Sequence, residues 1–279
     1  MFGLTPSQYL LNATIRKHGE KYRKVDPEFA RKVKKHFDDL NTGVYEVSDG
    51  HELYKKFKLR FMEAGFNIRK WRTNSEELKK LIPDEDLAND GVKVLGVKWN
   101  KKNDTLQLGV QEVFEVAEKL VPTKRNVLKA ITSVFDPAGY LQPVVIMLKL
   151  LFQEICAAKV KWDTRLNVTL EEKWLKAVKC LKGNADMVFD RCYYFYDIDD
   201  PVKSVYLHGF SDASQVAFGA CVYLKAVTNS GKVSVSLVTG KSRVAPIRKK
   251  ITIPRLELLG KIYFGETNEG CSSDVIRRN

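Results

Sequence analysis

Four acidic residues of this chain have the side chains and the neighbours for chemistry on phosphate. Asp38 and Asp39 are adjacent and follow a basic, aromatic segment, while Asp212 and Glu257 lie on two separate, later segments. Acids gathered in a strongly basic protein favour a divalent metal ion that acts on phosphate, because the ion offsets the repulsion between carboxylates. The number of acids that can share one ion therefore decides which function is possible.

The pair Asp38-Asp39 has two interpretations. Adjacent aspartates repel each other in a partly dehydrated site, so they either face solvent or share a cation. The turn-forming residues Asn41-Thr42-Gly43 and the strand-like segment from Val44 to Val47 come next. This order predicts a hairpin with the acids at its tip. An ordinary solvated turn is the commoner explanation of such a pair.

Asp212 and Glu257 are better placed for a metal site. Asp212 follows an apolar, strand-like segment and precedes the small residues Ala213 and Ser214, which leave room for an ion and a phosphate. Glu257 lies in the first turns of a helix predicted to open after Pro254. Two acids from different elements can provide part of the ligands of a two-metal site, but such sites ordinarily need three or more acids. A turn aspartate and a solvated helix glutamate explain the same pattern, so both interpretations stay open.

The excess of basic residues indicates a polyanionic partner. The formal net charge is +13, although 44% of the residues are hydrophobic, so the charge is spread over a folded surface. Cationic side chains neutralise phosphates, and tryptophan rings between them stack on unpaired bases. A solvated basic face is the alternative for any one cluster. The candidate nucleic-acid-binding residues are Lys70, Trp71, Arg72, Lys98, Trp99, Lys124 and Arg125.

The sequence lacks the residue patterns that are characteristic of several other classes of protein. The five cysteines form no Cys-x-x-Cys pair and have no histidine at zinc spacing, which predicts reduced thiols in an intracellular, cytoplasmic or nuclear protein. No apolar run is long enough to span a membrane, and no signal peptide opens the chain, so no membrane partner is expected. The sequence contains neither a phosphate-binding P-loop nor a Ser-His-Asp or Cys-His arrangement.

The hydrophobic periodicity predicts helices and strands in more than one domain. The middle of the chain is mainly helical and is interrupted at Asp136-Pro137-Ala138-Gly139. Helices are predicted over 5–20, 26–35, 48–65, most of 123–181 and after Pro254. Strands are predicted over 44–47, 93–99, 105–108, 202–210, 217–225 and 232–239.

The order of several segments resembles the polymerase polyprotein of Bel/Pao-type long-terminal-repeat retrotransposons. The resemblance extends over about residues 2–260. Eight segments carry this resemblance. The first two resemble a reverse-transcriptase palm with its Asp-Asp hairpin, and the next four resemble the parts that follow the palm. The last two resemble the start of a ribonuclease H domain. In chain order they are Phe2 to Ile15, Asp38 to Gly43, Gly65 to Trp71, Val94 to Trp99, Thr123 to Leu128, Phe135 to Pro143, His208 to Tyr223 and Ile253 to Gly260.

This resemblance implies an α+β multidomain fold. A partial reverse-transcriptase palm is expected over residues 1–110, and a mainly helical thumb and connection over 111–200. A truncated α/β ribonuclease H-like domain is expected over 201–279.

The resemblance also implies two magnesium- or manganese-dependent reactions. Asp38 and Asp39 correspond to catalytic, metal-binding residues of nucleotidyl transfer. Asp212 and Glu257 correspond to those that cleave RNA in an RNA–DNA hybrid. The expected partner is therefore an RNA–DNA hybrid or another nucleic acid.

The sequence departs from the family pattern at both sites. The family's first polymerase aspartate lies upstream of the segment that opens this chain, and the spacing before Asp38 is irregular. The ribonuclease H resemblance fails after about Gly260, before two further aspartates are expected, and Asp274 lies in glycine-rich, polar surroundings. We therefore expect a fragment with two incomplete active sites, a weakly bound metal ion and little activity.

Two other hypotheses remain, and one is rejected. The chain could be a non-catalytic nucleic-acid-binding remnant that keeps the basic surface, or a fragment that does not fold stably. A peptidase name is also attached to this region of Pao elements. No Asp-Thr-Gly or Asp-Ser-Gly sequence occurs, and Asn41-Thr42-Gly43 lacks the acid, so the sequence argues against an aspartic protease.

Overall fold

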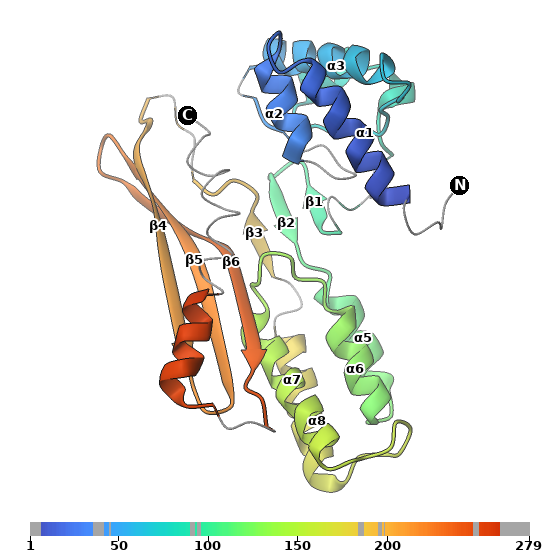
Figure 1. Ribbon diagram of the computed structural model, residues 1–279, viewed down its shortest axis with the longest axis vertical. Coiled ribbons are helices and arrows are strands. Elements are labelled where there is room, and N and C mark those ends of the chain that lie inside the picture. Colours follow the sequence, from blue (N-terminus) through green and yellow to red (C-terminus); the bar gives the residue numbers. More distant parts are fainter. Residues whose placement is uncertain are drawn as a thin grey trace. The chain divides into compact units, whose positions relative to one another are not determined.

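The computed structural model divides into two compact units, Met1–Leu95 and Gly96–Asn279 (Figure 1). Each unit has buried apolar residues of its own. The structure describes residues 7–35, 42–44, 46–89, 93, 96–183, 187–194, 197, 199–247 and 251–262.

Unit 1 is helical in the part that the structure describes. Its elements are α1 (Ser7–Lys21), α2 (Pro27–Lys35), α3 (Val47–Met62), α4 (Glu76–Leu81) and the 3-10 turn η1 (Asp84–Asp86). The three helices predicted here are confirmed. The strand predicted over 44–47 is wrong at its described residues: Val44 and Glu46 lie in no strand, and Val47 opens α3. The helical spacing of Tyr54, Phe57 and Phe61, which are buried along α3, explains why a helix forms there.

The core of unit 1 is aromatic. Phe29 of α2 packs edge-on against Phe57 and Phe61 of α3, with ring centroids 5.0 and 5.8 Å apart. The carboxylate of Asp26 accepts a hydrogen bond from the N–H of Phe29 (3.1 Å), and Pro27 occupies the first helical position, where no donor is needed. The cap of α2 therefore also fixes the ring at the centre of the core.

A buried ion pair joins α3 to η1. Asp86 is only 2% exposed, and its carboxylate accepts hydrogen bonds from the ammonium of Lys58 and the hydroxyl of Tyr54 (2.6 Å). Burial opposes the ionisation of Asp86, but the hydrogen bonds from Lys58 and Tyr54 outweigh it and lower its pKa. Burial and the same carboxylate raise the pKa of Tyr54 to about 12. The Tyr54 hydroxyl therefore remains a donor.

We expect Asp86→Ala to lower the free energy of unfolding by about 3 kcal/mol, because Lys58 would stay largely buried without its partner. The lowered pKa makes this contribution fully present above the unfolded value near 3.8, and it is lost as the pH falls through the folded value. Urea unfolding at a series of pH values measures both effects. Asp84→Ala, at an exposed position of the same turn, is the control, and equal stabilities of the two variants would contradict the expectation.

Unit 2 begins with a small antiparallel sheet and four helices. The strands are β1 (Lys98–Asn100), β2 (Thr105–Gln107) and β3 (Val188–Asp190), and the helices are α5 (Val110–Lys119), α6 (Lys124–Ser133), α7 (Gln142–Ala157) and α8 (Val168–Lys182). This confirms the predicted hairpin, with shorter strands, and the mainly helical middle region. The helices bury an apolar core that includes Leu148, Ile155 and Trp174. No helix in the described ranges is long and apolar enough to cross a membrane.

The rest of unit 2 is a sheet of long strands with a helix on one face. The strands are β4 (Val202–Ala213), β5 (Ala217–Thr228) and β6 (Val233–Val244), which pair antiparallel in the order β4-β5-β6. They confirm the three predicted strands and extend each of them. A helix over 253–262 also confirms the prediction, and its Leu256 is fully buried beside Phe218 and Ala245. The fold class is therefore α+β, as predicted.

The interrupted segment between α6 and α7 is organised by one carboxylate. Asp136 accepts hydrogen bonds from the N–H groups of Gly139 (2.9 Å), Tyr140 (2.9 Å) and Leu141 (2.8 Å). This turn brings Gly139, with a φ of +85°, against the backbone of Gly240 in β6. The N–H of Gly240 donates to the carbonyl of Ala138 (2.8 Å). The turn is thus bonded directly to the sheet.

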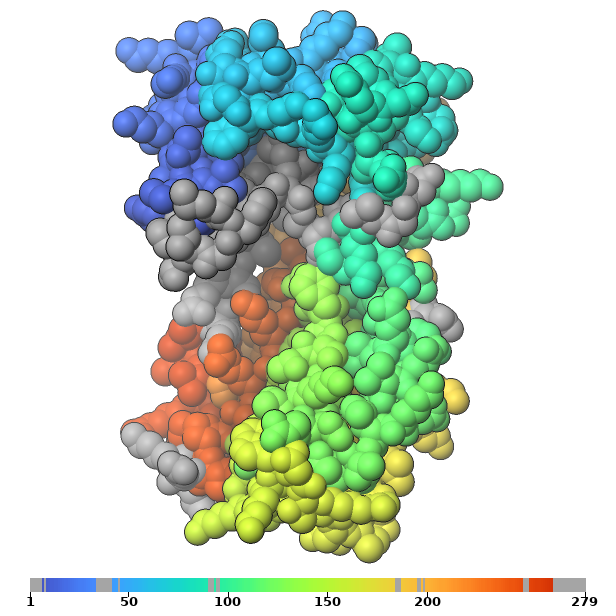
Figure 2. Space-filling view, turned by 90° about the vertical axis from the view of Figure 1, so that its right-hand side faces the viewer, coloured from blue at the N-terminus to red at the C-terminus, as the bar shows by residue number. Residues whose placement is uncertain are grey.

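Helix α7 continues this junction along β6. Gln142 Oε1 accepts hydrogen bonds from the N–H (3.2 Å) and hydroxyl (2.9 Å) of Ser242, and Lys149 donates to the Ser242 carbonyl (3.1 Å). Gln153 donates to the carbonyl of Ala245 (2.6 Å). Both views place α7 between β6 and the helices α5 and α6 (Figures 1 and 2). Side chains of α7 therefore satisfy backbone groups at this edge of the sheet.

We expect Gly139→Ala to lower the free energy of unfolding by at least about 2 kcal/mol more than Gly231→Ala. Both glycines have positive φ, +85° and +87°, but an added Cβ would overlap the Gly240 backbone only at Gly139 and would meet nothing within 4 Å at Gly231. Urea unfolding of the two variants measures the difference. Similar losses would show that the close approach of Gly139 to Gly240 contributes little.

Candidate nucleic-acid and metal-binding sites

Asp212 lies near the end of β4, opposite Gly219 of β5. Its side chain is exposed, and one carboxylate oxygen accepts a hydrogen bond from the N–H of Ala213 (2.8 Å). Neighbouring side chains of a strand project to opposite faces, so Asp212 projects away from the face that carries Ser211 and Ala213. Three exposed residues of β4 share the face of Asp212 by the same alternation: Tyr206, His208 and Phe210.

Glu257 lies on the helix that covers the other face of this sheet. Leu256 packs with Phe218 and Ala213, and a Cβ added to Gly260 would lie 3.3 Å from the Cβ of Ser211. Glu257 itself is exposed. Asp212 and Glu257 therefore belong to opposite sides of the sheet. Neither forms an ion pair with another described residue.

The donor set that the structure describes does not fit a two-metal site. Within the described ranges, no group of three or more His, Cys, Asp or Glu residues could hold a metal ion. Asp212 and Glu257 are two exposed carboxylates that belong to opposite sides of the sheet, whereas two-metal chemistry needs more ligands around both ions. The other predicted pair, Asp38 and Asp39, lies outside the described residues.

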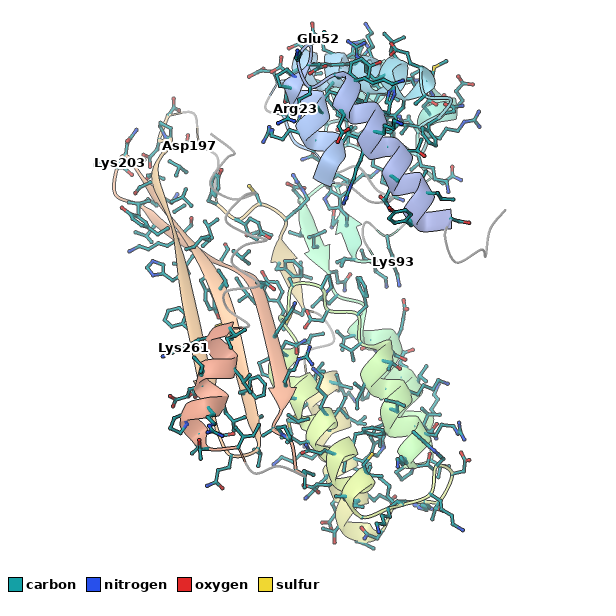
Figure 3. The ribbon with its side chains drawn as sticks, viewed as in Figure 1. Arg23, Glu52, Lys93, Asp197, Lys203 and Lys261 are labelled. Atoms are coloured by element: carbon teal, nitrogen blue, oxygen red, sulfur yellow. The ribbon has the colours of Figure 1, made fainter. Side chains whose placement is uncertain are left out.

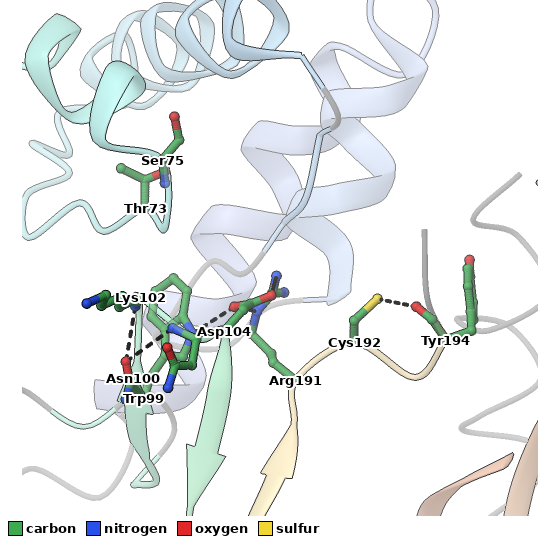
Figure 4. A network of polar contacts seen from close by, with 10 residues as sticks. Thr73, Ser75, Trp99, Asn100, Lys102, Asp104, Arg191, Cys192 and Tyr194 are labelled. Carbon is green, nitrogen blue, oxygen red and sulfur yellow. Dashed lines mark hydrogen bonds and ion pairs between the residues drawn. The ribbon is translucent and has the colours of Figure 1, made fainter. Parts of the chain in front are cut away.

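Lys98 and Trp99, two predicted nucleic-acid contacts, take part in contacts within unit 2. Figure 4 shows Trp99 with Asp104 and Arg191. Lys98 pairs with Glu112 (3.2 Å), and the indole N–H of Trp99 donates to Asp104 (3.0 Å). Both carboxylate oxygens of Asp104 also accept hydrogen bonds from Arg191, at 2.7 Å each. Burial opposes the ionisation of Asp104, but these hydrogen bonds lower its pKa. Trp99 therefore helps to hold the small sheet together.

Lys70, Trp71 and Arg72 lie in unit 1. Lys70 is exposed and has a positive φ of 62°, whereas Trp71 and Arg72 are half-buried. The backbone N–H of Trp71 donates to the carbonyl of Asp86 (2.7 Å), and the indole ring of Trp71 packs edge-on against Tyr54 at 4.9 Å between centroids. Trp71 thus contributes to the packing of unit 1, and the side chain of Lys70 faces solvent.

Lys124 and Arg125 meet an aromatic residue that the sequence analysis did not single out. The Lys124 ammonium lies 4.7 Å from the ring centroid of Trp162, which is 45% exposed. Arg125 forms two hydrogen bonds to Asp163, at 2.6 and 3.0 Å, and its backbone N–H donates to the Trp162 carbonyl (3.1 Å). The sequence signal was a tryptophan close to Lys159 and Lys161, in a region predicted to be mainly helical. Only the fold brings it next to Lys124.

We expect millimolar Mg²⁺ to leave the melting temperature unchanged. An ion stabilises a protein only to the extent that it binds the folded state preferentially. Among the described residues, no group of three or more His, Cys, Asp or Glu residues could hold the ion. Thermal melts with and without MgCl₂ test this, with Glu172→Gln as a control for the loss of an exposed acid. A rise in melting temperature that Asp212→Asn abolishes and Glu172→Gln does not would contradict it.

A protein-family model matches the part of the chain that carries these features. The model for the Pao retrotransposon-like RNaseH-like domain matches residues 123–271, more than half of the chain. The match begins at the N-cap of α6 and includes Lys124, Arg125, Asp212 and Glu257. No curated protein matches the chain. The match confirms the predicted Pao and ribonuclease H-like relationship, and the chain therefore belongs to the Pao retrotransposon family by virtue of its RNaseH-like domain.

Proposed function

We propose that this chain is a retrotransposon-derived nucleic-acid-binding protein whose RNaseH-like domain holds an RNA–DNA hybrid without cleaving it efficiently. The family match supports the class of ligand. The observation that carries the proposal is the combination of a net charge of +13 with Asp212 and Glu257 on opposite sides of the sheet. The chain keeps the charge that attracts a polyanion. Its two described candidate acids belong to opposite sides of the sheet, whereas hydrolysis by metal ions requires several ligands around both ions.

Exposed basic side chains are distributed along both units. In unit 1 they include Arg23 and Lys93, and in unit 2 Lys203 near the start of β4 and Lys261 near the end of the helix over 253–262 (Figure 3). Such residues bind the sugar–phosphate backbone and release counterions, which does not depend on base sequence. This distribution supports recognition of the charge of a hybrid rather than of individual bases.

We also infer a polymerase origin for residues 1–200, of which residues 123–200 lie within the family match as well. A reverse-transcriptase palm over 1–110 and a thumb and connection over 111–200 are supported by the Asp38-Asp39-Leu40 segment and by the block from Phe135 to Pro143. Asp38 and Asp39 would be the metal-binding acids of that ancestral site, as Asp212 and Glu257 would be of the ribonuclease H site. Efficient metal-dependent primer extension by the chain would overturn the view that the polymerase site is incomplete.

We expect the full chain to bind an RNA–DNA hybrid with an affinity that falls steeply with salt. If about 6 phosphate contacts form, the association constant falls roughly 10³-fold between about 50 and 200 mM salt. Fluorescence anisotropy with a labelled hybrid measures the affinity. Asp212→Asn and Glu257→Gln should bind as tightly as the unmodified chain. Failure to bind hybrid near physiological salt would overturn the proposal.

A cleavage assay on the RNA–DNA hybrid tests whether the chain retains ribonuclease H activity. With Mg²⁺ or Mn²⁺ present, the chain should release little product from the RNA strand, and Asp212→Asn should not change that rate. Robust cleavage that Asp212→Asn and Glu257→Gln abolish, and that Glu172→Gln leaves intact, would show that these acids form a working site.

A further inference from the structure

The loop between α7 and α8, residues 158–167 and here called the Trp162 loop, is fixed to the start of α6. The N–H of Arg125 donates to the carbonyl of Trp162 (3.1 Å), and the N–H of Leu166 donates to the carbonyl of Pro122 (2.9 Å). A β-bridge also joins Thr123 to Arg165. The loop is therefore held by backbone hydrogen bonds along its length.

Side chains brace the same loop at both ends. Arg125 is bonded twice to Asp163, and Arg165 is bonded twice to Glu171, at 3.2 and 2.8 Å. Asn167 caps α8 by accepting a hydrogen bond from the N–H of Leu170 (3.0 Å). These contacts keep Trp162 in a set position at the surface, so little ordering is needed when a ligand binds.

The surface around Trp162 is aromatic and cationic. The indole is 45% exposed, and the ammonium of Lys124 lies 4.7 Å from its centroid. Lys159 and Lys161 of the Trp162 loop are also exposed. Arg125 is already paired with Asp163, so the available cations are these three lysines. A planar ring among lysines offers a nucleic acid a stacking surface and charges for its phosphates.

We propose that Trp162, Lys124, Lys159 and Lys161 form a binding site for single-stranded nucleic acid, in which an unpaired base stacks on the indole and the lysines contact phosphates. This proposal rests on the nucleic-acid-binding function proposed above. It adds that the ligand is single-stranded and that its binding site lies at the Trp162 loop. A duplex keeps its bases stacked on one another and has none to offer to the ring. The site therefore favours a single strand over a paired one.

The contact between Lys124 and Trp162 does not prevent a base from stacking on the indole. An exposed cation–π contact is weaker than the stacking of a base on an aromatic ring, so a base can replace the ammonium at the ring. The ammonium of Lys124 then moves to a nearby phosphate, with which it forms a charge-assisted hydrogen bond. Arg125 stays on Asp163 and acts as a positioning residue for the loop.

The test compares two probes on the full chain by fluorescence anisotropy: a labelled oligothymidylate of about 12 nucleotides and a labelled RNA–DNA hybrid. We expect Trp162→Ala to weaken oligothymidylate binding about 10-fold and hybrid binding less than about 3-fold. Trp162→Phe, which keeps an aromatic ring, should restore most of the loss. Lys124→Ala should weaken oligothymidylate binding more than Lys176→Ala, which removes an exposed charge from α8.

The outcomes separate the two proposals. If the chain binds hybrid but Trp162→Ala leaves oligothymidylate binding unchanged, or weakens both probes equally, the single-strand site is wrong and the proposed function stands. If the chain binds neither probe, both proposals fail. Thermal melts of Trp162→Ala and Trp162→Phe check folding. A loss of binding in Trp162→Phe equal to that in Trp162→Ala would also count against stacking.

Discussion

The architecture of unit 2 depends on the hydrogen bonds that the carboxylate of Asp136 accepts from three consecutive backbone N–H groups. Without them, Gly139, Tyr140 and Leu141 would carry unsatisfied donors at the point where α7 begins. The turn that Asp136 stabilises places Gly139 against Gly240, and only a residue without Cβ fits there. The same turn directs α7 along β6. One side chain thus connects the helical part of the unit to the long sheet.

The contacts of α7 with β6 determine which parts of the sheet remain accessible. Gln142 and Lys149 satisfy backbone groups of β6, and Gln153 satisfies the carbonyl of Ala245 directly after it. The opposite outer strand of the described sheet is β4. The helix over 253–262 covers one face near Ser211. Asp212 projects from the other face, beside exposed aromatic residues of β4. The two acids that resemble a ribonuclease H pair are therefore separated by the sheet that presents them.

The basic and aromatic residues of the chain have several roles that composition does not distinguish. Trp99 is bonded to Asp104 within the small sheet, and Arg125 holds Asp163. Lys124 and Trp162, in contrast, lie together at an exposed and well-braced loop. A net positive charge predicts a polyanionic partner for the whole protein. Which cations are available to that partner depends on the acids that the fold places beside them.

The sequence by itself determined the helices, the three long strands and the α+β class, because local periodicity and turn residues specify them. The family relationship came from the resemblance of several segments to Pao elements, and the match over residues 123–271 bears it out. The sequence also identified the acids Asp212 and Glu257. Tertiary structure decided that these acids start from opposite sides of a sheet, since this follows from strand register and from where the helix packs. It also decided that Lys124 meets Trp162. Such contacts join residues far apart in the chain, and no local pattern encodes them.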